Sequence, residues 1–372
     1  MNSVSMSMWK KFVVAISLAT LPLLFCQAQE GAVPRPIIHT YFIAADEVNW
    51  DYTPQGRALG GIPHTEASEE GSEDRGHRIF KKAIYREYTD ETFKTLKPRS
   101  PQWEHLGILG PLIRAEVGDS IRVIFRNNTK LNLTMHPHGL AYTKDAEGTL
   151  YNDGTSGAAK KDDMIMPGGT YTYVWSVPER AGPGPMDGSS VLWMYHSHFI
   201  ESKDMNTGLF GPIIVTRRVM SKPDGTPKDV DREFIAAFAV FDETDNWYFD
   251  TSMVKTIRSL TLRSTDPAFR EKYLLYSING FIEGNLPLLT MKRGERVRWY
   301  LLSNSNEDDV HTAHWHGQTA VWSGMRTDTV PLGPMAMAVA DMVPDQVGTW
   351  LFHCHVNDHF NGGMYATFKV VP

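Results

Sequence analysis

The chain has 372 residues, enough for two or three ordinary domains, and its formal net charge is −6. This mild acidity argues against a nucleic-acid partner, which normally meets a basic patch. Hydrophobic residues make up 42% and charged residues 22%, so wholesale disorder and coiled coil are both excluded. Two cysteines exclude a disulfide-dense scaffold. Fourteen histidines, most of them in four tight clusters, are the informative feature.

Residues 1–28 have the pattern of an export signal. Lys10 and Lys11 precede a mostly apolar run at 12–25, which is short for a membrane-spanning helix, and small Ala28 suits a cleavage point. Lipid attachment at Cys26 is the alternative. We therefore expect an exported protein, periplasmic or extracellular, without a transmembrane segment. Removal of the signal would leave Cys354 as its one cysteine.

Runs of β-branched and aromatic residues alternate with Gly, Pro, Asn and Asp turns. Residues 221–231 have the composition of a linker and 56–78 that of an exposed loop, and short motifs recur in the same order on both sides of the linker. We predict an all-β protein of two homologous domains, 35–220 and 230–372, each with two packed antiparallel sheets and Greek-key connections. The expected strands include Tyr41–Asp46, Ser120–Arg126, Thr170–Trp175, Val297–Leu302 and Tyr365–Val371.

The histidines form four His-x-His pairs, two in each half of the chain. On a β-strand, residues i and i+2 point to the same face, so each pair sets two imidazoles side by side. One pair alone would be ordinary surface chemistry, but four pairs in repeated positions predict a site for several transition-metal ions where the domains meet. The pairs are His136/His138, His196/His198, His314/His316 and His353/His355.

A second ligand set surrounds Cys354. If the histidines that flank Cys354 face one way on the strand, the thiol faces the other way, toward His359 and Met364. His311, three residues before His314, is the remaining candidate ligand. Two imidazoles, a thiolate and a thioether are the ligands of a blue, electron-transfer copper with a long axial methionine. A zinc site would rarely use methionine, so copper is favoured.

Taken in order, His-x-His-Gly, His-x-His, His-x-x-His-x-His-Gly and His-Cys-His-x-x-x-His-x-x-x-x-Met resemble the four copper motifs of multicopper oxidases. The likeness is greatest to the first and last domains of the ceruloplasmin and hephaestin group, and the two-domain layout is similar to that of small laccases. The resemblance implies cupredoxin-like β-sandwich domains and four coppers in each functional unit. It implies type 1 ligands His311, Cys354, His359 and Met364, type 2 ligands His136 and His314, and type 3 ligands His138, His196, His198, His316, His353 and His355.

The resemblance further implies that a substrate gives single electrons to the type 1 copper, and that Cys354 passes them through His353 and His355 to the site that reduces O2 to water. Ser197 stands where Cys354 stands in the second half, and Leu133 where His311 does, so the first half would have no type 1 copper. In the family the cluster lies between two domains, so a two-domain chain is expected to form a homotrimer with clusters between subunits.

The identity of the electron donor is left open between two classes. Asp358, Glu271 and Glu307 match an iron site of the ceruloplasmin group, which favours Fe(II) or another metal ion as substrate, and hard carboxylates suit such an ion. Tyr276 departs from the family, which has an iron-binding histidine there. The alternative is a laccase-like oxidase of phenols and aromatic amines.

Three further interpretations have weaker support in the sequence. A copper nitrite reductase would carry its type 1 cysteine in the first domain, where this chain has Ser197. A non-catalytic copper-binding protein would not be expected to keep every ligand. Asp162 and Asp163 match a calcium-binding acidic pair of the family, although a solvated loop explains them as well.

Overall fold

The computed structural model describes residues 35–372 except 57–58, 60, 63–77, 250–266 and 305–309. The stretch Arg35–Pro372 is one compact unit. The predicted export signal, its alternative lipid site Cys26, Glu307 and most of the predicted loop at 56–78 lie outside the described residues.

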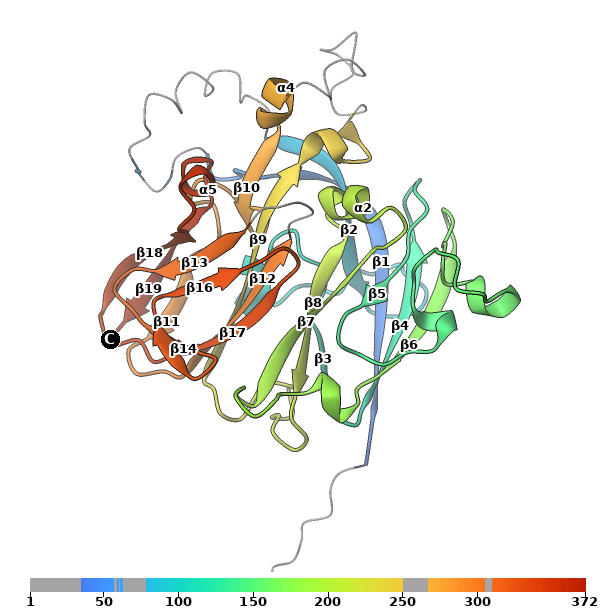
Figure 1. Cartoon of the computed structure of the whole chain (residues 1–372), viewed down its shortest axis with the longest axis horizontal. Helices are drawn as coiled ribbons and strands as arrows, with labels where there is room; N and C mark the ends of the chain where they lie inside the picture. Colours follow the sequence, from blue (N-terminus) through green and yellow to red (C-terminus); the bar gives the residue numbers. More distant parts are fainter. Residues whose placement is uncertain (1–34, 57–58, 60, 63–77, 250–266, 305–309) are drawn as a thin grey trace, which may run out of the picture. The chain divides into compact units, whose positions relative to one another are not determined.

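The strands of the first half are Ile38–Asp51 (β1), Ile79–Tyr88 (β2), Ile113–Glu116 (β3), Ser120–Asn127 (β4), His136–Pro137 (β5), Thr170–Ser176 (β6), Ser190–His196 (β7) and Phe210–Thr216 (β8). They form two four-stranded sheets, ordered β2-β1-β4-β6 and β3-β8-β7-β5 (Figure 1). Every second side chain of β4 is buried, from Ile121 to Asn127. The apolar alternation in the sequence therefore marks the face that packs inward.

The strands of the second half form a six-stranded and a five-stranded sheet. Their bounds are Arg232–Asp242 (β9), Leu274–Ile278 (β10), Leu289–Lys292 (β11), Val297–Asn304 (β12), His311–Trp315 (β13), Ala320–Trp322 (β14), Met325–Thr327 (β15), Thr329–Leu332 (β16), Met337–Met342 (β17), Gly348–Cys354 (β18) and Tyr365–Val371 (β19). The sheet orders are β10-β9-β12-β17-β14-β15 and β11-β19-β18-β13-β16. β12 is buried along its whole length, as expected of a strand covered on both faces.

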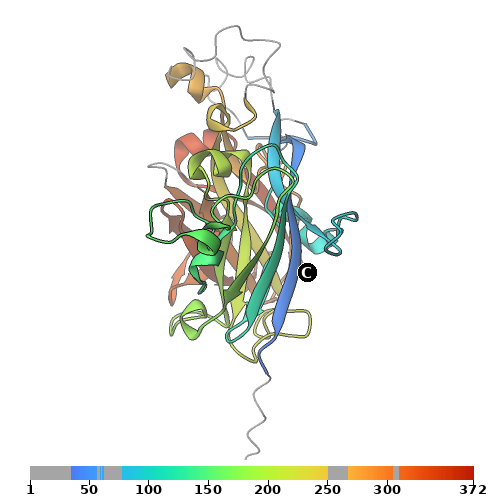
Figure 2. The ribbon, with the colours of Figure 1, turned by 90° about the vertical axis from the view of Figure 1, so that its right-hand side faces the viewer.

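All four sheets are mixed, whereas the sequence predicted antiparallel sheets. The parallel pairs are β1 with β4, β3 with β8, β9 with β12, and β11 with β19. Figure 2 shows the long blue strand β1 beside the other strands of its sheet. Parallel neighbours need long crossover connections, which a local alternation pattern does not reveal. The all-β, cupredoxin-like fold is confirmed, and the five expected strands are present as β1, β4, β6, β12 and β19.

Helices in the described part of the chain are short. They are Glu201–Thr207 (α2), Pro267–Glu271 (α4), Asn357–Asn361 (α5), and the 3-10 turns Pro101–Leu106 (η1), Lys144–Ala146 (η2), Gly157–Lys160 (η3), Glu179–Ala181 (η4) and Glu243–Asp245 (η5). Among these residues, no helix has the length and apolar character needed to cross a bilayer. α2 and α5 matter for function, because each follows a His-x-His pair.

Three hydrophobic clusters hold the strands together. One lies in the second half around Trp299 and Phe352 and includes Cys354, and another lies mainly in the first half. The third draws on both halves, for example Phe80 and Tyr300, so the halves share buried apolar surface. The boundaries 35–220 and 230–372 stay a prediction.

Candidate metal centres

Cys354, His311 and His359 converge inside the second half, in an entirely buried site. Cys354 ends β18, His311 begins β13, and His359 lies on α5. The Sγ atom lies 3.8 Å from Nδ1 of His311 and 3.6 Å from Nδ1 of His359, and the two Nδ1 atoms are 3.1 Å apart. The exposed fractions are 0% for Cys354 and His311 and 5% for His359. Three soft or borderline donors this close, shielded from water, fit a copper ion.

Met364 is attached to the same site by its backbone. Its N–H donates to the carbonyl of His359 at 2.9 Å, and its carbonyl accepts the N–H of Cys354 at 3.1 Å. Its side chain is fully buried in the same hydrophobic cluster as Cys354. The short segment from His359 to Met364 is therefore bonded to the backbone of Cys354, and Met364 stays a predicted ligand.

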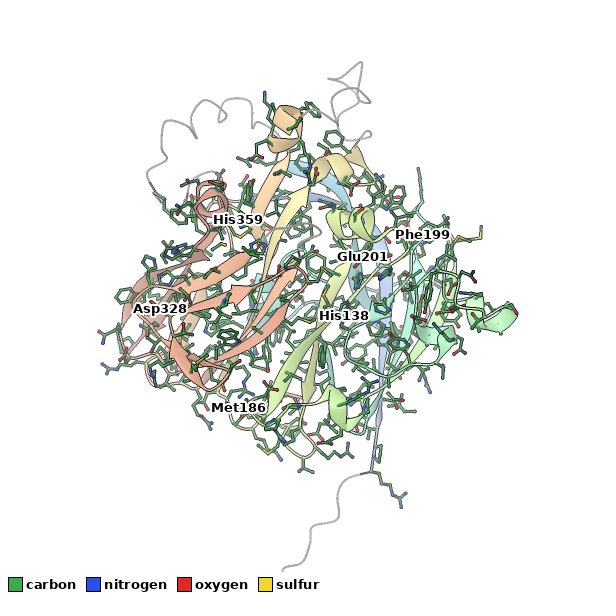
Figure 3. All side chains as sticks on the ribbon, viewed as in Figure 1. His138, Met186, Phe199, Glu201, Asp328 and His359 are labelled. Carbon is green, nitrogen blue, oxygen red and sulfur yellow. The ribbon has the colours of Figure 1, made fainter. Side chains whose placement is uncertain are left out.

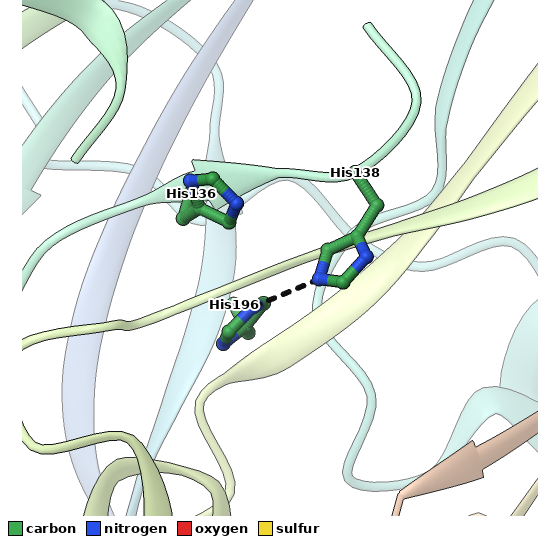
Figure 4. A group of neighbouring side chains, drawn as sticks. All are labelled: His136, His138 and His196. Atoms are coloured by element: carbon green, nitrogen blue, oxygen red, sulfur yellow. Dashed lines mark hydrogen bonds between the residues drawn. The ribbon is translucent and has the colours of Figure 1, made fainter. Parts of the chain in front are cut away.

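The first half gathers four histidine rings at the ends of β5 and β7. His136 and His196 are cross-strand neighbours, and Nε2 of His196 lies 3.0 Å from Nε2 of His138 (Figure 4). The rings of His136 and His198 have their centroids 5.3 Å apart. These four side chains come from two adjacent strand ends, so the sheet itself brings them together.

The second half repeats this arrangement. His314 of β13 and His353 of β18 are cross-strand neighbours, and Nε2 of His353 lies 3.1 Å from Nε2 of His316. The ring centroids of His314 and His355 are 5.2 Å apart. In both halves the second histidine of a pair lies just beyond the strand, not within it. The chain turns there, at positive-φ glycines 139 and 317 or into α2 and α5, and the rings still lie side by side.

Backbone carbonyls fix the ring orientation of matching histidines in the two halves. Nδ1–H of His136 donates to Glu147 at 2.7 Å, and Nδ1–H of His314 donates to Asp328 at 3.0 Å. In the same way, His196 meets the carbonyl of Ser197 at 3.1 Å and His353 that of Cys354 at 2.7 Å. A ring that donates through Nδ1 presents Nε2 as its free lone pair, which is the form a metal ion needs.

Burial keeps the imidazoles neutral. Burial, together with the charge that neighbouring histidines would carry, lowers the pKa of His138 to about 4 and, in the second half, the pKa of His353 to about 4. Burial also lowers the pKa of His196 well below its usual value. Neutral imidazole is the metal-binding form, so these groups do not have to lose a proton at neutral pH.

The histidines of the two halves stay in separate groups. Among the described residues, the sets whose donor atoms lie within 4.8 Å of one another are His136/His138/His196, His196/His198/Glu201, His314/His316/His353 and His311/Cys354/His359. Each set belongs to one half, and Figure 3 labels His138 and Glu201 on the green ribbon of the first half and Asp328 and His359 on the orange-red ribbon of the second. Each half therefore holds its own group of histidines.

Glu201, which none of the motifs in the sequence includes, also contacts the first histidine group. Its Oε2 lies 3.3 Å from Nε2 of His198, and its side chain is 41% exposed. The signal was present, because a carboxylate three residues after a histidine, at the start of a helix, can reach back to it. Glu201 adds a negative group to the histidines of the first half.

The proposed substrate site is only partly assembled in the described residues. Asp358 and Glu271 are both exposed, at the beginning of α5 and the end of α4. Tyr276 lies between the predicted substrate site and the thiol site. Its hydroxyl donates to Oε1 of Glu271 at 3.1 Å, and its ring centroid is 5.3 Å from that of His359. Tyr276 thus contacts both a surface carboxylate and a histidine of the thiol site.

Asp162 and Asp163 are buried, at 0% and 3% exposure, so the solvated-loop interpretation is wrong. Asp162 accepts the backbone N–H of Gly148 through Oδ2 at 2.8 Å, and its Oδ1 is buried without a hydrogen-bond partner. Asp163 is 3.0 Å from the ammonium of Lys160. The ammonium group of Lys160 therefore already supplies one positive charge to this acidic pair.

The chain matches two family models, both described as "Multicopper oxidase", at residues 105–219 and 257–372. Together these two ranges make up more than half of the chain. A ferroxidase of Mus musculus, HEPHL1, is 39% identical over 91% of this chain and 29% of its own length. Human hephaestin is 38% identical over 94% of this chain and 31% of its own length. Rat ceruloplasmin is 40% identical over 90% of this chain and 32% of its own length. The chain spans about a third of the length of these relatives.

Solved structures agree on the fold. The multicopper oxidase mgLAC superposes with a TM-score of 0.58 at 18% identity, covering 90% of this chain and 87% of its own. The blue copper oxidase of Nitrosomonas europaea superposes with a TM-score of 0.56 at 19% identity, covering 90% of this chain and 86% of its own. The chain belongs to the multicopper oxidase family. Copper is the cofactor that this family uses, and the donor sets described above fit it.

Proposed function

We propose that the protein oxidises a reducing substrate one electron at a time at the Cys354 site and reduces O2 to water at the histidine site. Fe(II) or another metal ion is the proposed substrate. Copper bound at these residues would supply the chemistry, taking up single electrons and delivering four to each O2. The residues proposed for type 1 copper are His311, Cys354, His359 and Met364, for type 2 His136 and His314, and for type 3 His138, His196, His198, His316, His353 and His355.

The observation that carries this proposal is the end of β18. Two consecutive residues there serve two donor groups: the thiol of Cys354 faces Nδ1 of His359, while Nε2 of the preceding His353 faces Nε2 of His316. The backbone between them is a covalent path only one residue long. Electrons accepted at the thiol side therefore have a short through-bond route to the histidine side.

The surrounding residues have three tasks. The hydrophobic cluster around Trp299, Trp315 and Phe352 excludes water from the thiol. Low pKa values keep His138 and His353 neutral, and backbone carbonyls hold the rings in one tautomer. These features prepare the donor atoms before any ion binds.

The complete histidine site is proposed to form between subunits of a C3 homotrimer, where the first half of one chain meets the second half of the next. The separation of the histidines into one group per half supports this arrangement. Two inactive variants test it: His138→Gln/His196→Gln in one, and His316→Gln/His353→Gln in the other.

Mixed and reassembled at equal amounts, the two variants should recover activity, because about a quarter of the interfaces would pair two intact halves. Each variant alone should stay inactive. If mixing restores nothing, or if the fully active wild-type protein has the mass of a monomer in light scattering, the intersubunit site is contradicted.

A specific observation favours the second candidate, a laccase-like oxidase of phenols and aromatic amines. The hydroxyl of Tyr276 already occupies one oxygen of Glu271, so this carboxylate is less available to a metal ion. The first candidate is supported by Asp358, which is exposed next to the ligand His359.

Turnover of Fe(II) and of 2,6-dimethoxyphenol by wild type and Asp358→Ala separates the two candidates. A metal-ion oxidase should lose Fe(II) turnover selectively in the variant, because the carboxylate next to the thiol site is gone. If Asp358→Ala oxidises Fe(II) like the wild type, the metal-substrate site is wrong.

Export through the signal at 1–28, to the periplasm or outside the cell, is proposed from the sequence alone. Calcium near Asp162 and Asp163 remains part of the proposal, supported by the buried, unpartnered Oδ1 of Asp162. The ammonium of Lys160 satisfies Asp163 and reduces the need for a bound cation.

A further inference from the structure

We propose that Asp162 is a positioning residue for the first histidine group, and this inference rests on the proposed copper-binding function. Its carboxylate holds the backbone of residues 146–149, and that backbone orients His136 and His198. Asp162 itself touches neither histidine through its side chain, so the effect passes through the intervening segment.

Residues 146–149 run beside both histidines. The carbonyl of Glu147 accepts Nδ1–H of His136 at 2.7 Å, and Thr149 forms a parallel β-bridge with His198. The first contact selects the tautomer of His136, and the second fixes the chain from which His198 projects. A displacement of this segment would therefore disturb two predicted ligands together.

The segment is clamped from behind by Asp162. Oδ2 of Asp162 accepts the N–H of Gly148 at 2.8 Å, and the Asp162 carbonyl accepts the hydroxyl of buried Tyr173 at 3.1 Å. Asp162 is fully buried, and burial raises the pKa of its carboxyl. Keeping a carboxylate at such a position costs free energy, so its bond to the Gly148 N–H is a contact with a specific role.

Gly148 has no room to move toward β5. Its φ is +72°, and a Cβ atom there would lie 2.2 Å from the carbonyl oxygen of Met135, the residue before His136. A side chain at 148 would push directly on the strand that carries His136. The position of this segment is thus defined on both sides, by Asp162 and by Met135.

Among the described residues of the second half, the corresponding turn is held by a local contact and not by a buried carboxylate. His314 donates Nδ1–H to the carbonyl of Asp328, and that turn is held locally by the N–H of Thr329 donating to Oγ1 of Thr327 at 3.1 Å. The side chain of Asp328 is 55% exposed. His314 is therefore an internal reference, because changes at Asp162 should leave it untouched.

The test uses the full-length protein with Asp162→Ala, Asp162→Asn and, as control, Asp119→Asn, another buried acid of the first half. Nitrogen-15 NMR of the copper-free protein reports the tautomer of His136 and of His314, and titration with Cu(II) reports ion binding. Asp162→Ala should lose the single Nδ1–H tautomer of His136 and weaken Cu(II) binding to the first histidine group about tenfold or more. Asp162→Asn, which keeps an acceptor for Gly148, and Asp119→Asn should behave like wild type.

The proposal is overturned if Asp162→Ala keeps both the His136 tautomer and the Cu(II) affinity. It is also overturned if Asp162→Asn fails as Asp162→Ala does and removal of calcium from wild type has the same effect, because a bound cation would then be responsible. Should Asp162→Ala not fold, Gly148→Ala must reproduce the loss at His136, and an unchanged His136 there refutes the clamp. The tautomer measurement needs no copper, so it stands even if wild type binds none and the proposed function fails.

Discussion

Ser197 donates a hydrogen bond of 2.7 Å to the carboxylate of Asp204, and both residues are fully buried. The backbone around Ser197 matches that around Cys354: Ser197 N–H donates to Leu209 at 3.0 Å, as Cys354 N–H does to Met364 at 3.1 Å. In the first half a polar pair therefore fills the position where the second half gathers thiol and imidazoles.

Ser197→Cys should not create a second thiolate copper site. Leu133 stands at the position of His311, and the Ser197 hydroxyl is bonded to Asp204 and to the N–H of Thr134 instead of facing an imidazole. The blue absorption per chain should equal that of wild type, and lost hydrogen bonding to Asp204 should lower the free energy of unfolding by about 1–2 kcal/mol. Visible spectra and urea unfolding check both points; a doubled absorption would show that the first half still forms a type 1 site.

Cys354→Ser should remove one copper per chain and leave the histidine sites loaded. The thiolate is the one anionic ligand proposed for its site, whereas the imidazoles at the other groups keep their carbonyl anchors. Copper content and electron paramagnetic resonance measure the two effects separately. Loss of all copper would instead mean that Cys354 supports the whole structure, and Ser197→Ala serves as control for a change at the matching position.

Acid should destabilise the protein through His105. Burial lowers the pKa of His105 to about 4, and its Nε2 accepts the N–H of Ile235 at 3.2 Å, which needs the neutral ring. Because the unfolded chain binds the proton at higher pH than the folded one, stability is full above about pH 6.5 and falls by about 3 kcal/mol as the pH drops toward 4.

The measurement for His105 is the free energy of unfolding of copper-free protein against pH, with His105→Gln alongside. Glutamine does not titrate, so its curve should be flatter than that of wild type between pH 6.5 and 4. Parallel curves would show that His105 contributes nothing to the acid sensitivity.

Tyr276→Phe should improve Fe(II) as a substrate. Removing the hydroxyl frees Oε1 of Glu271 from a hydrogen bond, while the ring stays against His359. One hydrogen bond is worth about 1 kcal/mol, so the KM for Fe(II) should fall about fivefold while turnover of 2,6-dimethoxyphenol and the blue absorption stay the same. An unchanged KM in steady-state assays would remove Glu271 from the substrate site.

Close spacing in the sequence predicted which residues would meet, because strand pleat and short loops leave little freedom. Cys354 and His359 converge for this reason. His311 joins them because β13 pairs with β18. The mixed sheets, the bridge from His105 to Ile235 and the clamp of Asp162 on Gly148 join segments distant in the chain. No local pattern encodes such contacts, so only the tertiary structure reveals them.

The visible absorption of wild-type protein loaded with Cu(II) tests the central claim most directly. Since Cys354 Sγ and two imidazole Nδ1 atoms converge in a buried site, the loaded protein should show an intense blue absorption that is absent from Cys354→Ser. A wild-type protein that binds its full copper and stays colourless would contradict the account.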